Sequence, residues 1–280
     1  MKKQILGVQI SSTLNDRFSN YRKVENIIKE ALSKDISPDI VVLPEVWTTG
    51  WDCYSFCDTK ENDLKTEDFL KELAVKYKAN IIGGSYIKET EDGNYNTCCV
   101  FLKNGEKLAE YKKIHLYSPD GEAKYVKSGD TPVIVEIEGL KIGLSICYDI
   151  RFPELYRSYI NSKSMPELLI NMSAWPKSRA AQYISMAQSR AIENQSYFLA
   201  LSQTGLIKND VYNAGNSLFV SPMGEIISKT GEEETYFNFE VDTDLVYKIR
   251  KTYPNLDNRK VFDFGFIPKY FVEKSLCSKK

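Results

Sequence analysis

The sequence predicts an α/β protein in which two β-sheets carry helices on their outer faces. Two observations support this fold class. Apolar runs typical of buried strands are separated by helical patterns along the 280 residues, and paired strand patterns flank turn signals such as Asn104-Gly105. No linker or repeat interrupts this arrangement, so we expect residues 1–252 to form one domain. The tail 253–280 is aromatic and aperiodic, and we expect it to pack on its own subunit or on a neighbouring one.

Each predicted strand is a short run rich in apolar or β-branched residues and bounded by turn residues. In the first part of the chain these runs are Lys3–Gln9, Ile40–Leu43, Asn80–Gly84, Tyr95–Lys103 and Glu106–Tyr111. In the second part they are Pro132–Glu138, Leu140–Ile146, Leu168–Met172, Tyr197–Ser202, Ser217–Val220, Glu225–Ser228 and Thr235–Val241.

Each predicted helix has either an apolar stripe at helical spacing or a start signal. Two helices are predicted over Arg17–Ser33 and from an N-cap at Thr66 to Tyr77. A short helix is predicted from Pro153, a long one over Ser178–Gln195, and a last one from an N-cap at Asp242 to Lys251.

Composition excludes several classes of function. The chain is 42% apolar and 27% charged with a net charge of −1, so neither nucleic acid nor a membrane surface is expected as a partner. Its six cysteines show no framework spacing, and His115 is the only histidine. We therefore expect no metal site and no disulfide framework, and a reducing cytoplasm as the compartment.

Cys147 is the first candidate for chemistry. It follows the apolar strand pattern Ile142–Ile146, and a helical pattern begins shortly afterwards at Pro153. A residue on a strand-to-helix turn lies at the sheet edge beside free backbone N–H groups, which can stabilise an oxyanion. The alternative is a buried structural cysteine, the commoner role of a free cysteine.

Two further stretches supply groups that a cysteine nucleophile needs. Glu45 follows the buried strand pattern that ends in Leu43-Pro44, and Lys113 lies in the basic run that leads into a long polar loop. A carboxylate can act as general base and later as general acid, and an ammonium group favours a thiolate and an oxyanion. Spacing alone does not bring these residues together.

These stretches, taken in order, resemble the motifs of the nitrilase superfamily of carbon–nitrogen hydrolases. The resemblance covers nearly the whole chain. The stretches that carry it are Leu43-Pro44-Glu45, Tyr111–Leu116, Gly121-Glu122, Cys147–Glu154, Arg190–Gln195, Gly215-Asn216-Ser217 and Ser221–Glu225.

The resemblance implies a four-layer α-β-β-α sandwich and a catalytic triad of Glu45, Lys113 and Cys147, with Glu122 as a second glutamate nearby. It also implies an oxyanion site formed by Lys113 and the Tyr148 backbone N–H. Such an enzyme hydrolyses a small-molecule amide through a Cys thioester and needs no metal or organic cofactor. Family members commonly pair subunits, so a homodimer or a higher homo-oligomer is expected, formed across residues 151–160 and the helix from Ser178.

Within the superfamily the ω-amidase-like branch is the most similar, on Pro44–Gly50, Asn171–Pro176 and Arg250–Arg259. The implied reaction releases ammonia from substrates such as 2-oxoglutaramate or 2-oxosuccinamate. The alternatives are a hydrolase of N-carbamoyl amines or other small amides and, in another class, a non-catalytic interaction scaffold. The intact Glu-Lys-Cys set argues against the scaffold.

An ω-amidase must bind a substrate carboxylate, which is costly to bury without a partner. Arg151 is the first candidate for that partner, and the pair Lys177 and Arg179 is the second. Trp47 and Trp175 are candidates for the pocket wall, although core packing explains them nearly as well. His115 would serve a Cys-His mechanism, but its place beside Lys113 favours a structural role.

Overall fold

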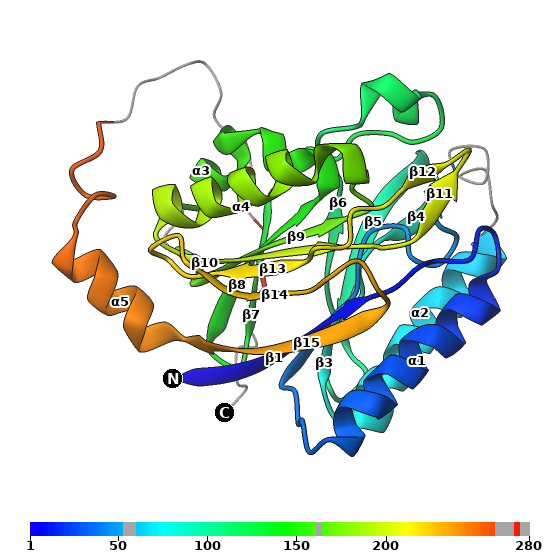
Figure 1. Cartoon of the computed structure of the whole chain (residues 1–280), viewed down its shortest axis with the longest axis horizontal. Coiled ribbons are helices and arrows are strands. Elements are labelled where there is room, and N and C mark those ends of the chain that lie inside the picture. The colour runs from blue at the N-terminus through cyan, green and yellow to red at the C-terminus, as the bar shows by residue number, and fades with distance from the viewer. Residues whose placement is uncertain (53–59, 161–163, 261–271, 275–280) are drawn as a thin grey trace.

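The computed structural model describes residues 1–52, 60–160, 164–260 and 272–274. Two seven-stranded sheets pack face to face. Helices α1 (Arg17–Ser33) and α2 (Lys60–Tyr77) cover the outer face of one sheet. Helices α3 (Pro153–Ile160) and α4 (Ala180–Asn194) cover the outer face of the other, as Figure 1 shows. The predicted α-β-β-α sandwich is therefore confirmed.

The first sheet runs in the order β15-β1-β2-β3-β5-β4, and β6 pairs with β5. Its parallel centre is formed by β1, β2 and β3, and the remaining pairs are antiparallel. The strands are β1 (Lys2–Gln9), β2 (Ile40–Val42), β3 (Asn80–Ile82), β4 (Tyr86–Thr90), β5 (Gly93–Phe101), β6 (Lys107–Lys112) and β15 (Thr235–Asp242).

The second sheet runs in the order β14-β13-β10-β9-β8-β7-β16. Strands β8, β9 and β10 are parallel, so their carboxyl ends meet at one edge of the sheet. The strands are β7 (Val133–Ile137), β8 (Leu140–Ile146), β9 (Leu168–Ser173), β10 (Tyr197–Ser202), β13 (Leu218–Val220), β14 (Ile226–Lys229) and β16 (Val272–Lys274). A separate hairpin consists of β11 (Leu206–Lys208) and β12 (Val211–Tyr212).

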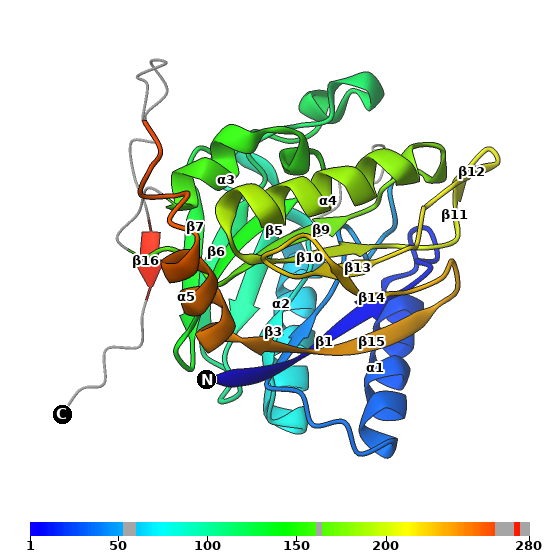
Figure 2. The ribbon, with the colours of Figure 1, turned by 60° about the vertical axis from the view of Figure 1, so that its left-hand side comes forward.

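The alternation of side chains along each strand divides the buried residues of the first sheet between two hydrophobic clusters, one on each face. In β5, Cys98 faces the second sheet and Cys99 faces α2, so the two neighbours belong to different hydrophobic clusters. Successive strand residues point to opposite faces. Both faces of this sheet are covered, which is why β2 is continuously apolar and β1 is buried from Ile5 to its end. Turning the ribbon by 60° shows the two sheets and the outer helices from a second side (Figure 2).

One predicted boundary is wrong and one strand was not predicted, and the reasons are local. Helix α2 begins at Lys60 rather than after Thr66. Thr66 does not cap the helix, because its hydroxyl is buried and shares a hydrogen bond of 2.7 Å with Tyr21 of α1. Strand β4 was not predicted, because its half-buried Lys88 and Glu89 obscure the apolar pattern.

The chain after β15 forms α5 (Thr243–Thr252), which Asp242 caps as predicted by accepting a hydrogen bond from the Asp244 N–H. Further along, β16 pairs in parallel with β7. The aromatic residues of the tail, Phe262, Phe264, Phe266, Tyr270 and Phe271, lie outside the described residues. Packing of the whole tail and subunit pairing across α3 and α4 stay predictions. In the part of the chain that the structure describes, no helix is both long and apolar enough to cross a bilayer.

The loop after β2 is held by the turn after β3. Ser85 donates its N–H to the Pro44 carbonyl at 3.0 Å, and its hydroxyl accepts a hydrogen bond from the Val46 N–H at 3.0 Å. Trp47 donates its indole N–H to the Gly83 carbonyl at 2.8 Å. Gly84 has φ +63°, and a Cβ there would lie 2.2 Å from the Pro44 oxygen and 2.8 Å from Trp47. The backbone on either side of residue 45 therefore depends on a glycine at position 84.

Replacing Gly84 with Ala should lower the free energy of unfolding by more than about 2 kcal/mol, because the new methyl group meets backbone and the φ angle is strained. Gly231→Ala is the matched control, since a Cβ at Gly231 meets nothing within 4 Å and should change that free energy by less than about 0.5 kcal/mol. Urea denaturation of the two variants and the parent measures the difference. Equal stability of the two variants would contradict this account of the loop.

Candidate active site

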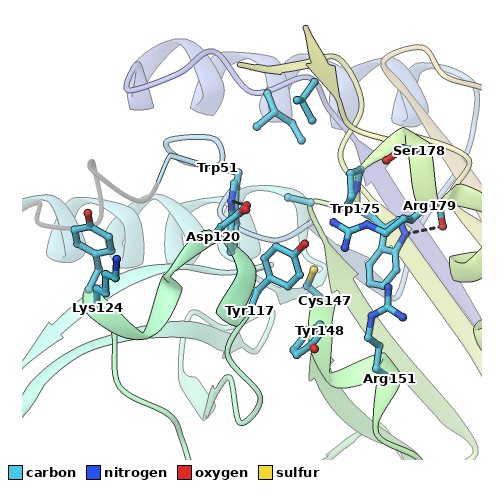
Figure 3. A pocket seen from close by; sticks show the side chains of 15 residues that line it. Trp51, Tyr117, Asp120, Lys124, Cys147, Tyr148, Arg151, Trp175, Ser178 and Arg179 are labelled. Carbon is cyan, nitrogen blue, oxygen red and sulfur yellow. Dashed lines mark hydrogen bonds between the residues drawn. The ribbon is translucent and has the colours of Figure 1, made fainter. Parts of the chain in front are cut away.

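A cavity of about 420 Å³ opens at the carboxyl ends of the parallel strands of the second sheet. Cys147, which follows β8, and Ala174, which follows β9, both line it. Figure 3 shows the Cys147 sulfur among aromatic and charged side chains, including Trp175 and Arg151. Substrates of α/β proteins commonly bind outside the carboxyl ends of strands, where side chains from several strands converge.

Cys147 occupies a strained turn. Its φ is +43°, which is uncommon for a residue with a side chain, and it begins the 3₁₀ turn Cys147–Arg151. Buried Asp149 holds this turn by accepting hydrogen bonds from the Ile146 N–H at 2.9 Å, the His115 N–H at 2.9 Å and the Tyr111 hydroxyl at 2.6 Å. The predicted strand-to-helix elbow is therefore present, and one carboxylate ties it to the other sheet.

Beside the thiol lies a buried group of two carboxylates and one ammonium. Lys113 Nζ is 2.9 Å from Glu45 Oε1 and 3.0 Å from both carboxylate oxygens of Glu122. None of the three side chains is exposed to solvent. Glu45 follows β2, Lys113 follows β6, and Glu122 lies in the 3₁₀ turn Glu122–Lys124. The structure thus brings three sequence-predicted residues into direct contact.

Burial and charge determine the protonation states at this site. Burial raises the pKa of the Cys147 thiol well above its usual value, and the Glu45 carboxylate raises it further, whereas Lys113 acts in the opposite direction. Burial alone would lower the pKa of Lys113, but the carboxylates of Glu122 and Glu45 raise it above its usual value. Cys147 is therefore a neutral thiol at rest, and Lys113 stays charged.

The neighbours of Glu45 affect the pKa of its carboxyl group and connect it to the second sheet. Burial raises the pKa of its carboxyl group, Lys113 opposes this, and the charge of Glu122 adds to it. Glu45 Oε2 accepts the Ala174 N–H at 2.8 Å, and the carbonyl of Glu45 accepts the side-chain amide of Gln203, so the loops after β9 and β10 of the second sheet contact this residue. A carboxyl group with a raised pKa next to a neutral thiol is suited to exchanging protons with it.

Three of the predicted substrate-binding residues line the cavity. Arg151 lies over the Trp175 ring at 5.0 Å and donates to Gln182 at 2.9 Å. Arg179 lies over the Tyr117 ring at 5.1 Å. Neither arginine forms an ion pair with any carboxylate of the described residues. Trp175 lines the cavity and is itself almost fully buried.

The other two predicted substrate-binding residues lie elsewhere. Lys177 is exposed and forms an ion pair of 2.6 Å with Glu232, away from the residues that line the cavity. Trp47 is fully buried in the cluster between the first sheet and its helices, against Tyr21 and Phe69. Packing of the outer core, rather than the cavity, accounts for Trp47.

The His115 ring contacts Asp149 and Phe152. Its Nδ1 lies 2.8 Å from Asp149, and its ring stacks on Phe152 with centroids 3.7 Å apart. These contacts match the structural role that the sequence favoured for it.

Sequence reasoning missed several residues of the site. Trp51 lies under Lys113, whose Nζ is 5.1 Å from the ring, and donates its indole N–H to Asp120 at 3.2 Å. Tyr117 lines the cavity and donates its backbone N–H to Glu122. Asn96 donates to both glutamates of the cluster. The only available signal was the position of Trp51 just after the Glu45 motif, and Asn96 gave no signal within its strand pattern.

Comparisons with known proteins agree with this geometry. Residues 7–251 match the carbon-nitrogen hydrolase family. A 2-oxoglutaramate amidase of Bacillus subtilis is 32% identical over 259 residues, which cover 92% of this chain and 98% of that protein. A chloroplastic omega-amidase of Arabidopsis thaliana is 32% identical over 264 residues, which cover 89% of this chain and 70% of that protein.

A solved structure shows the same fold. The crystal structure of Saccharomyces cerevisiae Nit3, a member of branch 10 of the nitrilase superfamily, superposes with a TM-score of 0.82 at 26% identity, and the match covers 90% of this chain and 94% of that one. The family match includes every residue of the buried cluster and all strands of the two sheets except β16 and the first part of β1. The chain therefore belongs to the carbon–nitrogen hydrolase family.

Proposed function

We propose that this enzyme is an ω-amidase that hydrolyses the side-chain amide of short 2-oxo dicarboxylic acid monoamides such as 2-oxoglutaramate and releases ammonia. One observation carries the proposal: the Cys147 thiol borders a cavity and interacts with the buried cluster of Glu45, Lys113 and Glu122. The similarity to proteins named 2-oxoglutaramate amidase and omega-amidase supports this choice of substrate.

In the first half-reaction Glu45 takes the thiol proton while the Cys147 sulfur attacks the amide carbon. Because the thiol is neutral at rest, this step needs a base in contact with it. Negative charge develops on the amide oxygen, where the Lys113 ammonium and the Tyr148 N–H in the first turn after Cys147 stabilise it. Glu45 then gives the proton to the leaving nitrogen, ammonia departs, and a thioester remains.

In the second half-reaction water occupies the position that ammonia has left. Glu45 takes a proton from this water, and the resulting hydroxide attacks the thioester carbon. The tetrahedral intermediate collapses with departure of the Cys147 sulfur, which receives its proton back from Glu45. The product is the 2-oxo dicarboxylic acid, and every step uses groups of the chain and water.

Glu122 maintains the charge that these steps require. A lysine buried beside a single carboxylate could lose its proton to that carboxylate, and the pair would then be neutral. The second carboxylate, 3.0 Å away, keeps the ammonium charged while Glu45 gains and loses a proton. Glu122 thus supports the oxyanion site through Lys113.

Arg151 and Arg179 supply the cationic side of the cavity. Both lie over aromatic rings of the wall and form no ion pair among the described residues, so their donors are available to a substrate carboxylate. A guanidinium can bind a carboxylate through two parallel hydrogen bonds. In the proposed complex the amide end of the substrate faces Cys147 and its acidic end faces the arginines.

The direct test is ammonia release from a panel of 2-oxoglutaramate, 2-oxosuccinamate, simple aliphatic amides and an N-carbamoyl amine. The expected order of kcat/KM has the two 2-oxo acids first. Preference for the N-carbamoyl amine or for aliphatic amides would replace the ω-amidase assignment by another small-amide hydrolase. Absence of turnover on the whole panel would favour the scaffold alternative.

Replacing Cys147 with Ala or Ser should reduce kcat by more than about 10³-fold, because Cys147 is the one cysteine of the described residues that lines the cavity. The matched control is Cys98→Ala, which alters a buried cysteine of β5 in the core between the sheets and should leave kcat within about twofold. Circular dichroism checks that all variants fold. Substantial activity in Cys147→Ala would show that the nucleophile lies elsewhere.

Glu122→Gln tests the charge balance of the cluster. Burial and then the charge of Glu122 raise the pKa of Glu45, so removing that charge lowers this pKa. The acidic limb of the kcat/KM profile should therefore move to lower pH, while kcat falls by about 10²-fold because Lys113 loses a charged partner.

Glu154→Gln, an exposed change on α3, is the control for Glu122→Gln and should alter neither quantity. If the limb of Glu122→Gln stays in place or moves to higher pH, the assigned coupling between the two glutamates is wrong.

Arg151→Met and Arg179→Met test the anchor for the substrate carboxylate. The true partner should lose about tenfold to a thousandfold in kcat/KM for 2-oxoglutaramate, the size of a lost charge-assisted hydrogen bond, and much less for an uncharged amide. Lys177→Met removes a nearby positive charge outside the cavity and is the matched control. An unchanged ratio in both arginine variants would refute a cationic anchor at these positions.

A further inference from the structure

We propose that Asn96 is a positioning residue for the hydrolysis, which occupies Glu45 Oε1 and thereby directs the Cys147 proton to Glu45 Oε2. This inference deepens the proposed function, since it concerns how the same base works. It rests on the hydrogen bonds of a residue that the sequence motifs did not single out.

The backbone brings Asn96 to the cluster. Asn96 lies on β5. Its carbonyl accepts a hydrogen bond of 2.8 Å from the N–H of Lys113, the first residue after the end of β6. Cross-strand neighbours in an antiparallel pair place their side chains on the same face. Asn96 and Lys113 therefore point together into the space between the sheets, and both are fully buried.

The side-chain amide of Asn96 joins the two carboxylates. Its Nδ2 donates to Glu45 Oε1 at 3.0 Å and to Glu122 Oε1 at 3.2 Å, which uses both of its protons. The opposite orientation of the amide would turn its oxygen toward two carboxylate oxygens. The charges of the cluster therefore fix which end of the amide faces the glutamates.

This orientation of the amide leaves the Asn96 side-chain oxygen without a hydrogen bond from the described residues, which lowers the stability of the folded state. Asn96 Oδ1 is buried and has no hydrogen-bond partner among the described residues. A buried polar atom without a partner is destabilising, and such atoms are rare in folded proteins. An apolar side chain of similar shape would avoid that cost, so the two donated hydrogen bonds are the distinctive contribution of this residue.

Counting acceptor sites identifies the reactive oxygen of Glu45. A carboxylate oxygen offers two lone pairs. On Oε1 both are used, by Lys113 Nζ at 2.9 Å and Asn96 Nδ2 at 3.0 Å. On Oε2 one is used by the Ala174 N–H at 2.8 Å, and the other has no hydrogen-bond donor among the described residues, although Glu45 interacts with the Cys147 thiol. The thiol proton can therefore be accepted at Oε2 without breaking a hydrogen bond of Oε1.

Asn96 also stabilises the ionised base. A hydrogen bond to a carboxylate favours its charged form and lowers its pKa. The other ionisable groups that act on Glu45 are Lys113, which follows β6, Glu122 in the next 3₁₀ turn, Cys147 after β8 and Tyr183 of α4. Without the Asn96 donors the repulsion of Glu45 by Glu122 is less compensated, and the Glu45 carboxyl group holds its proton to higher pH.

Asn96→Leu, which removes both donors at similar volume, provides the test. The acidic limb of the kcat/KM profile should move to higher pH by about one unit, the size expected for losing a hydrogen bond to a charged group. This direction is opposite to that expected for Glu122→Gln. At pH values above the limb, kcat should fall by about tenfold or more, because the base is no longer held in one orientation.

A second readout needs no substrate and so separates this inference from the substrate assignment. The rate at which iodoacetamide alkylates Cys147, located by mass spectrometry, should show the same displaced limb in Asn96→Leu. Asn80→Leu is the matched control, because Asn80 is a buried asparagine of the same sheet whose amide bonds to the backbone of Asp39 and Lys103. It should leave both limbs in place.

Asn96→Ser covers the case in which the leucine variant fails to fold. One hydroxyl donor should give a limb between those of the parent and Asn96→Leu. Lower rates with an unmoved limb in either folded variant would make Asn96 a purely structural residue and overturn the inference, as would unchanged rates or a shift to lower pH. A displaced alkylation limb in an enzyme inactive on 2-oxoglutaramate would support Asn96 and refute only the substrate.

Discussion

The structure depends on keeping one ammonium group charged where solvent does not reach. Lys113 has no exposed surface, and the transfer of a lone ammonium from water into such a place costs several kcal/mol. Glu45 and Glu122 together carry more negative charge than Lys113 carries positive, so the cluster is net anionic and needs additional donors. Backbone N–H groups of Ala174 and Tyr117 supply some of these. The loops around the site are arranged to present them.

The sandwich makes this arrangement possible. Glu45 and Lys113 come from the first sheet, whereas Cys147 and Ala174 come from the second. A single sheet could present such residues only along one edge, where water would compete for every hydrogen bond. Two sheets packed face to face enclose the groups between them, and the low dielectric there strengthens each interaction.

Much of the fold follows from local pattern. The strand runs, the cap at Asp242 and the buried stripe of α1 could all be predicted because burial and capping leave a periodic trace. The elbow at Cys147 was predicted for the same reason. Of the two neighbouring lysines at the end of the β5–β6 hairpin, Lys112 lies over the Tyr95 ring at 3.8 Å, whereas Lys113 is fully buried and joins the cluster.

What could not be predicted depends on tertiary contacts. Asn96 is one of several polar residues of β5, and nothing in the chain near it reveals that two glutamates lie opposite its amide. Thr66 resembles a cap until the hydroxyl of Tyr21 is placed beside it. The separation of Arg179 from Lys177 is likewise set by the turn before α4, which directs one side chain to the cavity and the other to Glu232.

The way the two sheets share the site has a consequence for folding. Asn96 and Lys113 meet through the local β5–β6 hairpin, so that part of the cluster can form early and with little loss of chain entropy. Glu45 meets the Ala174 N–H 129 residues away, a contact that exists only once both sheets have docked. Secondary structure can therefore persist in states that have lost catalysis, and the enzyme's activity reports on sheet docking rather than on strand formation.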